Sequence, residues 1–363
     1  MGQIEAGLDR FRPGQWHRLD ADQMSKVHKR FMAGWRVNIP AGSLELRTCD
    51  CLLLAIDAAF PNSQPRIFAP AAGSDYSWPH TERAGQLCLR SRKISAPIAD
   101  RVVAHLNDAE ELLNLPETKQ RQEFEREFNT YWSNRATNSS DRARVWSLVP
   151  PGGASREVLS FFNAKRNRYY IADDKESLKR WLSNIGDNPG DRHIYATWLF
   201  RLSRPWTPRE FPETCDEITK LLPPDIVRKY LEPGLPSPFL FEAVTKTGSA
   251  FAAVVLRGAQ RCEVMRGFRH MSKVPSAIIV NSYARRPVER CKVERADGAW
   301  VHGRDQASSY AMVKNRKVAV IGCGAIGAAV ARLLAQAGVG EQTFVDFDSL
   351  TTANVSRHPL GMS

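Results

Sequence analysis

The chain has 363 residues, a length that accommodates two or three domains. Its 25% of charged and 43% of hydrophobic residues are ordinary for a globular protein. No stretch is apolar enough for a membrane span, and the N-terminal sequence MGQIEAGLDR lacks the basic and apolar regions of a secretory signal. We therefore expect a cytoplasmic protein with no membrane partner.

The formal net charge of +12 permits nucleic-acid binding, but the Lys and Arg residues are scattered and form no long basic run. A solvated basic face, or one that meets ATP or an acidic protein, explains this charge more simply, so we expect no nucleic-acid partner. None of the seven cysteines forms a CxxC pair, which argues against a zinc or thioredoxin-like site, and no metal ligands are expected.

Residues 1–135 predict an α+β domain that begins with a helix capped by Asp20, with Gln23 completing a capping box and Gly34 ending the helix. Short strand-like runs follow, separated by turn residues, and they are typical of a β-meander. The expected strands lie over residues 35–39, 43–48, 51–57 and 66–69, and the expected helices over residues 20–33, 100–115 and 118–132.

The next region begins with residues 136–144, which are small, polar and charged and are expected to form a linker. Residues 145–300 mix strand and helix patterns and predict an α/β middle domain without a chemical motif. Strands are expected over residues 194–202, 239–244 and 250–256, and short helices over residues 215–222 and 226–231.

Residues 301–363 predict the start of a Rossmann-like α/β domain. A buried-strand pattern over 316–321 leads directly into Gly322-Cys-Gly-Ala-Ile-Gly327, and a helix over 328–337 and a strand over 343–345 follow. This order, with an acid 19 residues after the last glycine, is a dinucleotide-binding fingerprint.

Each residue of the fingerprint has a physical reason. Gly322 allows a tight turn, Gly324 lets backbone N–H groups approach phosphate, and Gly327 lets the helix pack closely. Asp346, at the end of the second strand, accepts from a ribose hydroxyl. The pattern predicts a nucleotide site but does not choose between NAD and ATP.

The following residues favour ATP. Asp346-Phe-Asp348, then Asn354 and Arg357, resemble the adenylation domains of ubiquitin-activating enzymes and of the ThiF and MoeB adenylyltransferases. The resemblance implies that Asp346 holds the ribose and that Asn354 and Arg357 contact the ATP phosphates. Arg304 resembles the arginine that reaches the ATP of the partner subunit in this family, which implies a homodimer.

A second resemblance centres on Cys88. Phe60-Pro61 and Pro65, then Trp78-Pro79-His80 and Gly85-Gln-Leu-Cys88-Leu89, resemble the FP, PxxxF, HPN and GxxCL elements of ubiquitin-conjugating enzymes, in order. The resemblance implies that Cys88 accepts an acyl group as a thioester; a small buried cysteine is the alternative.

Two features near Cys88 remain open. His80 stands where the conjugating enzymes have an asparagine that stabilises an oxyanion, so we expect His80 either to take over that role or to be a loop histidine packed on Trp78. Arg90, Arg92 and Lys93 either favour the Cys88 thiolate or are solvated charges.

The order of the domains, conjugating-like, middle and ThiF-type, resembles the bacterial fusions of CBASS antiphage operons. The resemblance implies adenylation of a protein C-terminus, that of a cGAS-like nucleotidyltransferase for example, transfer to Cys88 and ligation to an amine. An NAD-dependent oxidoreductase and a non-catalytic scaffold with an idle cysteine are the alternatives. Binding of labelled ATP rather than labelled NAD would argue against the oxidoreductase. A reactive Cys88 would argue against the scaffold.

The later lysine, magnesium-binding aspartate and transfer cysteine of the family would all lie beyond Ser363, so we expect ATP and Mg to bind only in a completed adenylation domain. We therefore predict that this chain alone shows no ATP–pyrophosphate exchange. Robust exchange by the purified chain would contradict the expectation that residues needed for adenylation lie beyond Ser363.

Overall fold

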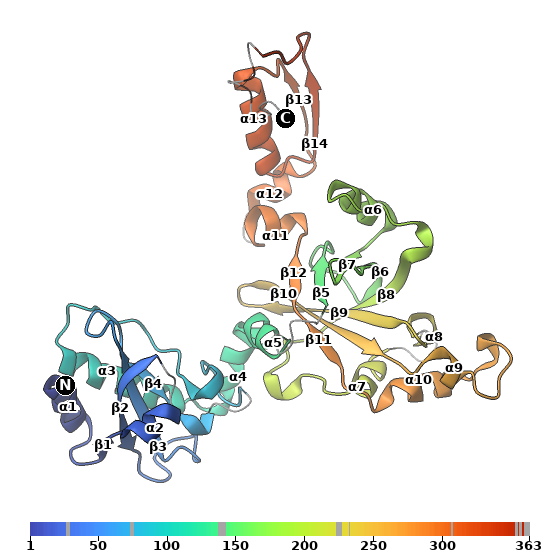
Figure 1. Ribbon diagram of the computed structural model, residues 1–363. Coiled ribbons are helices and arrows are strands. Elements are labelled where there is room, and N and C mark those ends of the chain that lie inside the picture. Colours follow the sequence, from blue (N-terminus) through green and yellow to red (C-terminus); the bar gives the residue numbers. More distant parts are fainter. Residues whose placement is uncertain are drawn as a thin grey trace. The chain divides into compact units, whose positions relative to one another are not determined.

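The structure is a computed structural model that describes residues 1–26, 30–72, 76–136, 143–222, 227–231, 233–305, 308–352, 355 and 358. It divides into two units (Figure 1). Unit 1 comprises Met1–Tyr131 and Trp206–Phe211, and unit 2 comprises Trp132–Pro205 and Pro212–Ser363. Within the described residues, no helix has both the length and the apolar character that a membrane crossing requires.

Unit 1 is an antiparallel four-stranded sheet, in the order β1-β2-β3-β4, with helices on its faces. Apolar side chains of α1 and α3 pack with those of the sheet in one core, which includes Leu8, Trp35 and Leu106. Its elements are α1 (Gly2–Phe11), β1 (Trp16–Arg18), α2 (Ala21–Lys26), β2 (Phe31–Asn38), β3 (Cys51–Asp57), β4 (Arg66–Phe68), α3 (Ile98–Leu113), α4 (Glu117–Arg126) and α5 (Phe128–Ala136), which continues into unit 2.

The first predicted helix, over residues 20–33, is wrong over residues 30–33; residues 27–29 lie outside the described residues. The capping box forms, because Gln23 N–H donates to Asp20 Oδ1 at 2.8 Å and Asp20 N–H donates to Gln23 Oε1 at 3.0 Å. However, β2 begins at Phe31, and the expected helix end, Gly34, lies inside that strand. A Cβ on Gly34 would lie 2.8 Å from Met24 Sδ, so the glycine lets α2 pack against the strand.

Three other predictions for unit 1 need correction. No strand forms over 43–48, where turns bury Leu44 and Cys49 instead. The helix expected over 118–132 is two helices, α4 and α5, that meet at Glu127. Helix α1 was not expected at all, although Ile4 and Leu8 make it amphipathic. Strand β3 occupies the range predicted for it, and β4 and α3 lie within two residues of theirs.

Unit 2 is built on a mixed eight-stranded sheet in the order β11-β10-β9-β8-β6-β7-β5-β12. Helix α6 packs on one face through Leu178 and Leu182. The strands are β5 (Arg144–Ser147), β6 (Arg156–Asn163), β7 (Arg168–Ala172), β8 (Ile194–Arg201), β9 (Pro236–Thr245), β10 (Gly248–Arg257), β11 (Glu289–Cys291) and β12 (Val293–Arg295), and the helices are α6 (Lys175–Asn184), α7 (Cys215–Thr219), α8 (Val227–Tyr230), α9 (Arg261–Val264) and α10 (Ser276–Ala284).

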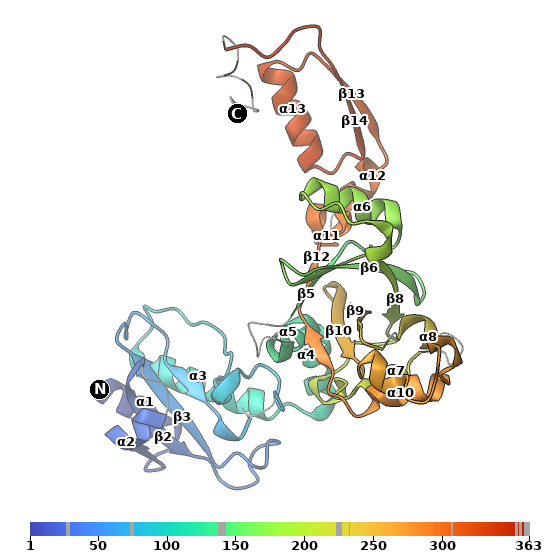
Figure 2. The same ribbon diagram turned by 45° about the vertical axis from the view of Figure 1, so that its right-hand side comes forward.

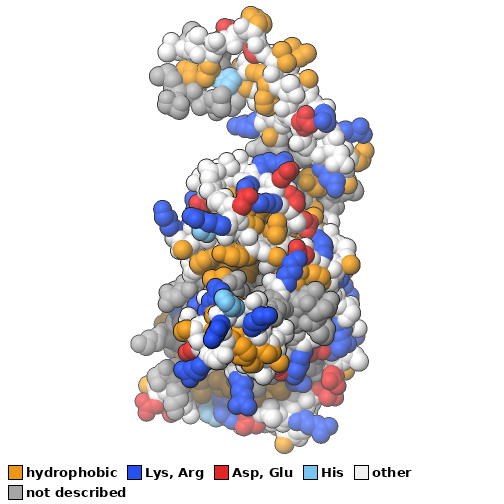
Figure 3. All heavy atoms as spheres, turned by 90° about the vertical axis from the view of Figure 1, so that its right-hand side faces the viewer, with side chains coloured by type: hydrophobic (Ala, Val, Ile, Leu, Met, Phe, Trp, Pro, Cys, Tyr) orange, Lys and Arg blue, Asp and Glu red, His pale blue; other side chains and the backbone are white. Residues whose placement is uncertain are grey.

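The last part of unit 2 is a strand–helix–strand segment that follows α11 (Gly298–Gly303) and α12 (Ser308–Val313). Strands β13 (Lys317–Ile321) and β14 (Glu341–Val345) pair in parallel, and α13 (Ala325–Gln336) lies alongside them (Figures 1 and 2). The sequence predicted all three elements. Many of their large apolar side chains face outward, as the hydrophobic atoms at the top of Figure 3 show; exposed examples are Ile321, Leu333 and Phe344.

We predict that Phe211→Ala destabilises unit 1. Phe211 is 2% exposed, and its ring centre lies 6.0 Å from that of Phe128 on α5. Removing a buried aromatic ring costs about 3–5 kcal/mol. Urea unfolding, with hydrogen exchange of the α4 amides as the local readout, measures the loss. Phe162→Ala, at a 40% exposed phenylalanine, is the matched control, and equal α4 protection in both variants would contradict the assignment of Trp206–Phe211 to unit 1.

Candidate active site

The segment before Cys88 is anchored to the edge of the unit 1 sheet. Ala69 N–H donates to Gly85 O at 2.8 Å, and Leu87 N–H donates to Ile67 O at 2.9 Å. Gly85 has a φ of +79°, and a Cβ there would lie 2.3 Å from Ala69 O, so only glycine fits. Leu87 is buried whereas Cys88, the next residue, is exposed. A buried anchor thus presents the thiol at the surface.

The same segment also pairs with the residues after Trp78-Pro79. Cys88 N–H donates to His80 O at 2.7 Å, Glu82 N–H donates to Gln86 O at 2.8 Å, and Thr81 and Leu87 form an antiparallel bridge between them. Because side chains alternate along paired strands, Glu82 and Cys88 share the face opposite Thr81 and Leu87, and His80 lines the same pocket as Cys88. This short hairpin sets the geometry of the candidate site.

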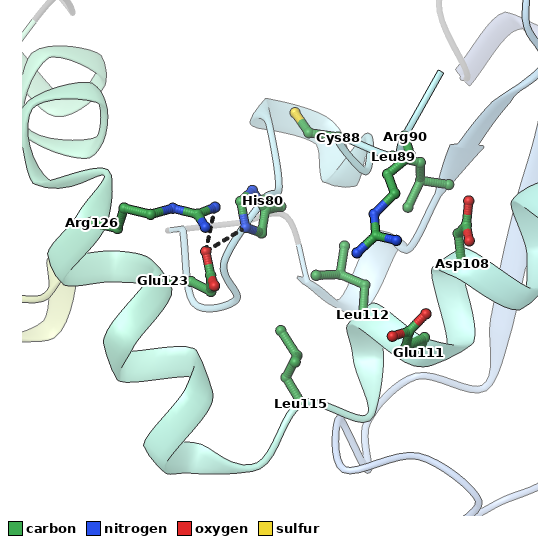
Figure 4. Close-up of a pocket in the computed structure, with 10 residues that line it drawn as sticks. All are labelled: His80, Cys88, Leu89, Arg90, Asp108, Glu111, Leu112, Leu115, Glu123 and Arg126. Carbon is green, nitrogen blue, oxygen red and sulfur yellow. Dashed lines mark hydrogen bonds and ion pairs between the residues drawn. The ribbon is translucent and has the colours of Figure 1, made fainter. Parts of the chain in front are cut away.

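His80 is held by groups from α4 and α5. Its ring Nε2 lies 3.1 Å from Glu123 Oε2 and its Nδ1 lies 3.6 Å from Glu127 Oε1. Its backbone N–H donates to the Tyr131 hydroxyl at 2.7 Å, and its φ is +55°. Figure 4 shows the ring directed toward Glu123. Trp78 is buried and donates to Leu112 O, so two carboxylates, and not packing on Trp78 alone, position the histidine ring.

Carboxylates also dominate the electrostatics at Cys88. The thiol donates to Glu82 Oε1 at a sulfur–oxygen distance of 3.7 Å. Desolvation, then the charge and hydrogen bond of Glu82, then the charge of Glu127, raise the pKa of Cys88 to about 11, while Arg66 acts in the opposite direction. The thiol is therefore protonated at neutral pH.

Of the two interpretations of the basic residues after Cys88, the structure favours solvated charges over help for the thiolate. Arg92 is engaged elsewhere, since its Nε donates to Asp108 Oδ2 at 3.2 Å. Arg90 and Lys93 are exposed, and the largest effects on the pKa of Cys88 come from other groups. They are solvated charges, which was the other interpretation of this sequence.

A pocket of about 380 Å³ opens beside Cys88 and His80 (Figure 4). Leu89, Leu112 and Leu115 give it apolar walls, and both signs of charge line the rest. The charged residues are Arg90, Asp108, Glu111, Glu123 and Arg126. Such a pocket suits the polar end of a flexible chain beside an apolar stem.

The sequence prediction of the site omitted three acidic residues, Glu82, Glu123 and Glu127. A signal existed for the latter two, because carboxylates four residues apart share one side of a helix; here Glu123 lies in α4 and Glu127 at its C-terminal end. Glu82 gave no such signal. Its position beside Cys88 depends on the register of the hairpin, which the sequence pattern does not specify.

The glycine loop before α13 has the conformation that the fingerprint demands. Gly322 has a φ of +82°, and a Cβ on Gly327 would lie 1.7 Å from Gly322 O, so neither position accepts a side chain without distortion. Gly324 is the N-cap residue of α13. Because Gly322 and Gly324 carry no side chains, backbone N–H groups at the start of α13 can approach a phosphate group.

Asp346 lies against this loop. Its carboxylate accepts from Asp348 N–H at 2.9 Å and from Cys323 N–H, and these backbone hydrogen bonds lower its pKa. An ionised acceptor beside the glycine turn fits a ribose hydroxyl. The structure thus brings Asp346 and Asp348 together with Gly322, Gly324 and Gly327.

The remaining predicted residues are placed differently. Arg304 ends α11 in a left-handed conformation, with its guanidinium carbon 6.0 Å from the centre of the Trp300 ring. Asn354 and Arg357 lie outside the described residues. His358 Nε2 is 2.9 Å from Cys323 O, next to the glycine loop. Across the part of the chain that the structure describes, no three His, Cys, Asp or Glu side chains form a group that could hold a metal ion.

Comparisons with known proteins match the two ends of the chain to two families. Residues 13–140 match Prokaryotic E2 family B, and residues 304–362 match the ThiF family. The first match covers the Cys88 hairpin and the carboxylates around His80, and the second covers the glycine loop and Asp346.

Three curated relatives are similar to parts of the chain. The ATP-dependent ubiquitin transferase-like protein Cap2 of Pseudomonas aeruginosa is 26% identical over 206 residues, 53% of this chain and 36% of that protein. The uncharacterized protein y4oA of Sinorhizobium fredii is 47% identical over 51 residues, 14% of this chain and 9% of that protein. The molybdopterin-synthase adenylyltransferase of Salmonella typhimurium is 42% identical over 48 residues, 13% of this chain and 19% of that protein. The chain therefore spans well under two-thirds of each relative's length.

We predict that alkylation of Cys88 by iodoacetamide is slow at neutral pH and rises about tenfold per pH unit up to pH 10, because only the thiolate reacts. With a pKa of about 11, roughly one thiol in a thousand is ionised at pH 8. Peptide mass spectrometry at each pH gives the rate. Arg92→Ala should leave the profile unchanged, because Arg92 pairs with Asp108. A plateau between pH 8 and 9 would contradict the acidic surroundings of Cys88.

Proposed function

Because the chain is a fusion of a Prokaryotic E2 family B domain with a ThiF family domain, we propose that it acts in ubiquitin-like protein conjugation, with Cys88 as the acyl carrier. The observation that carries this proposal is the exposed Cys88 thiol at the end of a buried, glycine-dependent anchor, beside a pocket. An idle structural cysteine would need neither the exposure nor the anchor. Ubiquitin itself need not be the conjugated protein.

The transfer to Cys88 is an acyl exchange. Cys88 Sγ bonds to the carbonyl carbon of an activated protein C-terminus, the bond from that carbon to its previous carrier breaks, and the thiol proton leaves with the carrier or to solvent. In the second half, an amine nitrogen bonds to the same carbon, and the carbon–sulfur bond breaks. His80 is proposed to support the oxyanion formed in both halves, with an N–H freed from one of its two carboxylate partners.

ATP-dependent adenylation of the protein C-terminus is the proposed source of the activated acyl group. Gly322, Gly324 and Gly327 would hold the phosphates and Asp346 the ribose, roles that the glycine loop before α13 and the ionised carboxylate support. Asn354 and Arg357 are proposed to contact the phosphates, and Arg304 to reach the nucleotide of a second subunit in a homodimer. Bound ATP with Mg would supply the energy that makes the carboxyl group reactive.

The name of the Pseudomonas aeruginosa relative, an ATP-dependent ubiquitin transferase-like protein, supports this combination. We propose a protein substrate with a flexible C-terminus, for example a cGAS-like nucleotidyltransferase in antiphage defence. The ThiF match favours ATP over the NAD of an oxidoreductase. The scaffold alternative predicts no acyl adduct at all, and the following experiment tests it.

We predict that Cys88 forms a thiol-sensitive adduct when the chain is supplied with a complete ThiF-type adenylation domain and incubated with ATP, Mg and a cGAS-like nucleotidyltransferase. Cys88→Ser should give a thiol-resistant ester, because an oxyester survives reductants that cleave a thioester. Cys88→Ala should form neither. Peptide mass spectrometry and gels with and without reductant give the readout.

Cys262→Ser is the matched control, because Cys262 is the other exposed cysteine among the described residues, and this variant should keep the adduct. If Cys88→Ala retains adduct and conjugates, Cys88 is not the carrier, and the scaffold interpretation of unit 1 becomes the better one.

A further inference from the structure

A carrier that passes an acyl group to an amine faces a protonation problem. At neutral pH an alkyl amine is almost entirely an ammonium ion, with no lone pair for attack, so a nearby base must remove a proton. The ring of His80 has carboxylates against both nitrogens, Glu123 Oε2 at 3.1 Å and Glu127 Oε1 at 3.6 Å. It is therefore poorly placed to serve as a free base.

Glu82 is better placed. The hairpin holds its backbone through the bond from Glu82 N–H to Gln86 O, and its carboxylate is the hydrogen-bond partner of Cys88 Sγ at 3.7 Å. In the loaded protein, the carbonyl carbon is one bond from that sulfur, so a nucleophile attacking this carbon comes within reach of the same carboxylate. The other charged groups that act on Cys88 are Glu127, at the junction of α4 and α5, and Arg66, on β4.

Resting on the proposed function, we propose that Glu82 is the general base that deprotonates the incoming amine at the Cys88 thioester. The ammonium loses one proton to the Glu82 carboxylate, and the neutral nitrogen bonds to the carbonyl carbon. The carbon–sulfur bond then breaks, Cys88 leaves as a thiolate, and a second proton from the nitrogen returns it to the thiol. One proton is released to solvent from Glu82, so the step balances without any other reactant.

Before Cys88 is loaded, the Glu82 carboxylate lowers the reactivity of the thiol instead of promoting a reaction. It accepts the S–H hydrogen bond and helps to keep the free thiol protonated, which makes Cys88 unreactive toward alkylating agents. Removing the charge of Glu82 should therefore change two reactions in opposite directions. A merely structural role for Glu82 would slow both or neither.

The experiment uses the chain with Cys262→Ser and Cys323→Ser, which leaves Cys88 as the accessible cysteine among the described residues. Cys88 is loaded at high pH with a glycine-ended peptide thioester and desalted, and discharge to free lysine at pH 7.5 is followed by intact mass. Glu82→Gln should slow amine-dependent discharge tenfold or more, while alkylation of the unloaded thiol by iodoacetamide becomes several-fold faster at pH 8. At pH 10, where much of the amine is already neutral, the difference in discharge should shrink.

Glu117→Gln, which removes an exposed carboxylate of α4 that does not line the pocket, should match the parent chain in both reactions. Equal discharge by Glu82→Gln and the parent at pH 7.5 would overturn the proposal, as would a defect of the same size at pH 10. Because only the loaded fraction is scored, failure here is distinct from failure of the carrier role, which the ATP-dependent adduct at Cys88 decides.

Discussion

The hairpin formed by residues 80–82 and 86–88 is the constraint on which the candidate active site depends. Two hydrogen bonds hold it to β4 and the residue after β4: Ala69 N–H donates to Gly85 O, and Leu87 N–H donates to Ile67 O. A third, from Cys88 N–H to His80 O, closes the hairpin internally. Gly85 makes this arrangement possible, because its positive φ and missing side chain let the backbone meet that of Ala69. Backbone geometry, together with the burial of Leu87, therefore decides where the thiol lies.

Much of the fold could be predicted from periodicity, because β3, α3 and the segment from β13 to β14 carry their own patterns. The errors lie where tertiary contacts override local pattern. Phe31 fits the helical stripe that starts at Met24 as well as it fits a strand, and pairing with β3 selects the strand. Residues 43–48 alternate like a strand, yet they have no partner in the sheet and form turns.

The candidate site was predictable in its motif residues and not in its electrostatics. Cys88, His80 and the three glycines follow from short sequence elements whose spacing is local. The charge around Cys88 comes mainly from Glu82 across the hairpin and from Glu127 at the junction of α4 and α5, and not from the basic residues that follow Cys88 in the sequence. Charge effects fall off with distance in space, so only the folded register reveals them.

The discontinuity of unit 1 has a consequence for its synthesis on the ribosome. Arg121 of α4 pairs with Glu210, and Phe128 of α5 packs on Phe211. The helices that hold His80 therefore contact residues 206–211, which are translated after β5 to β8. A nascent chain that has released residues 1–131 contains Cys88 but not this support. Because closing the long intervening loop costs chain entropy, we expect α4 and α5 to pack late, so that the Cys88 thiol acquires its final surroundings only after residues 206–211 have been translated.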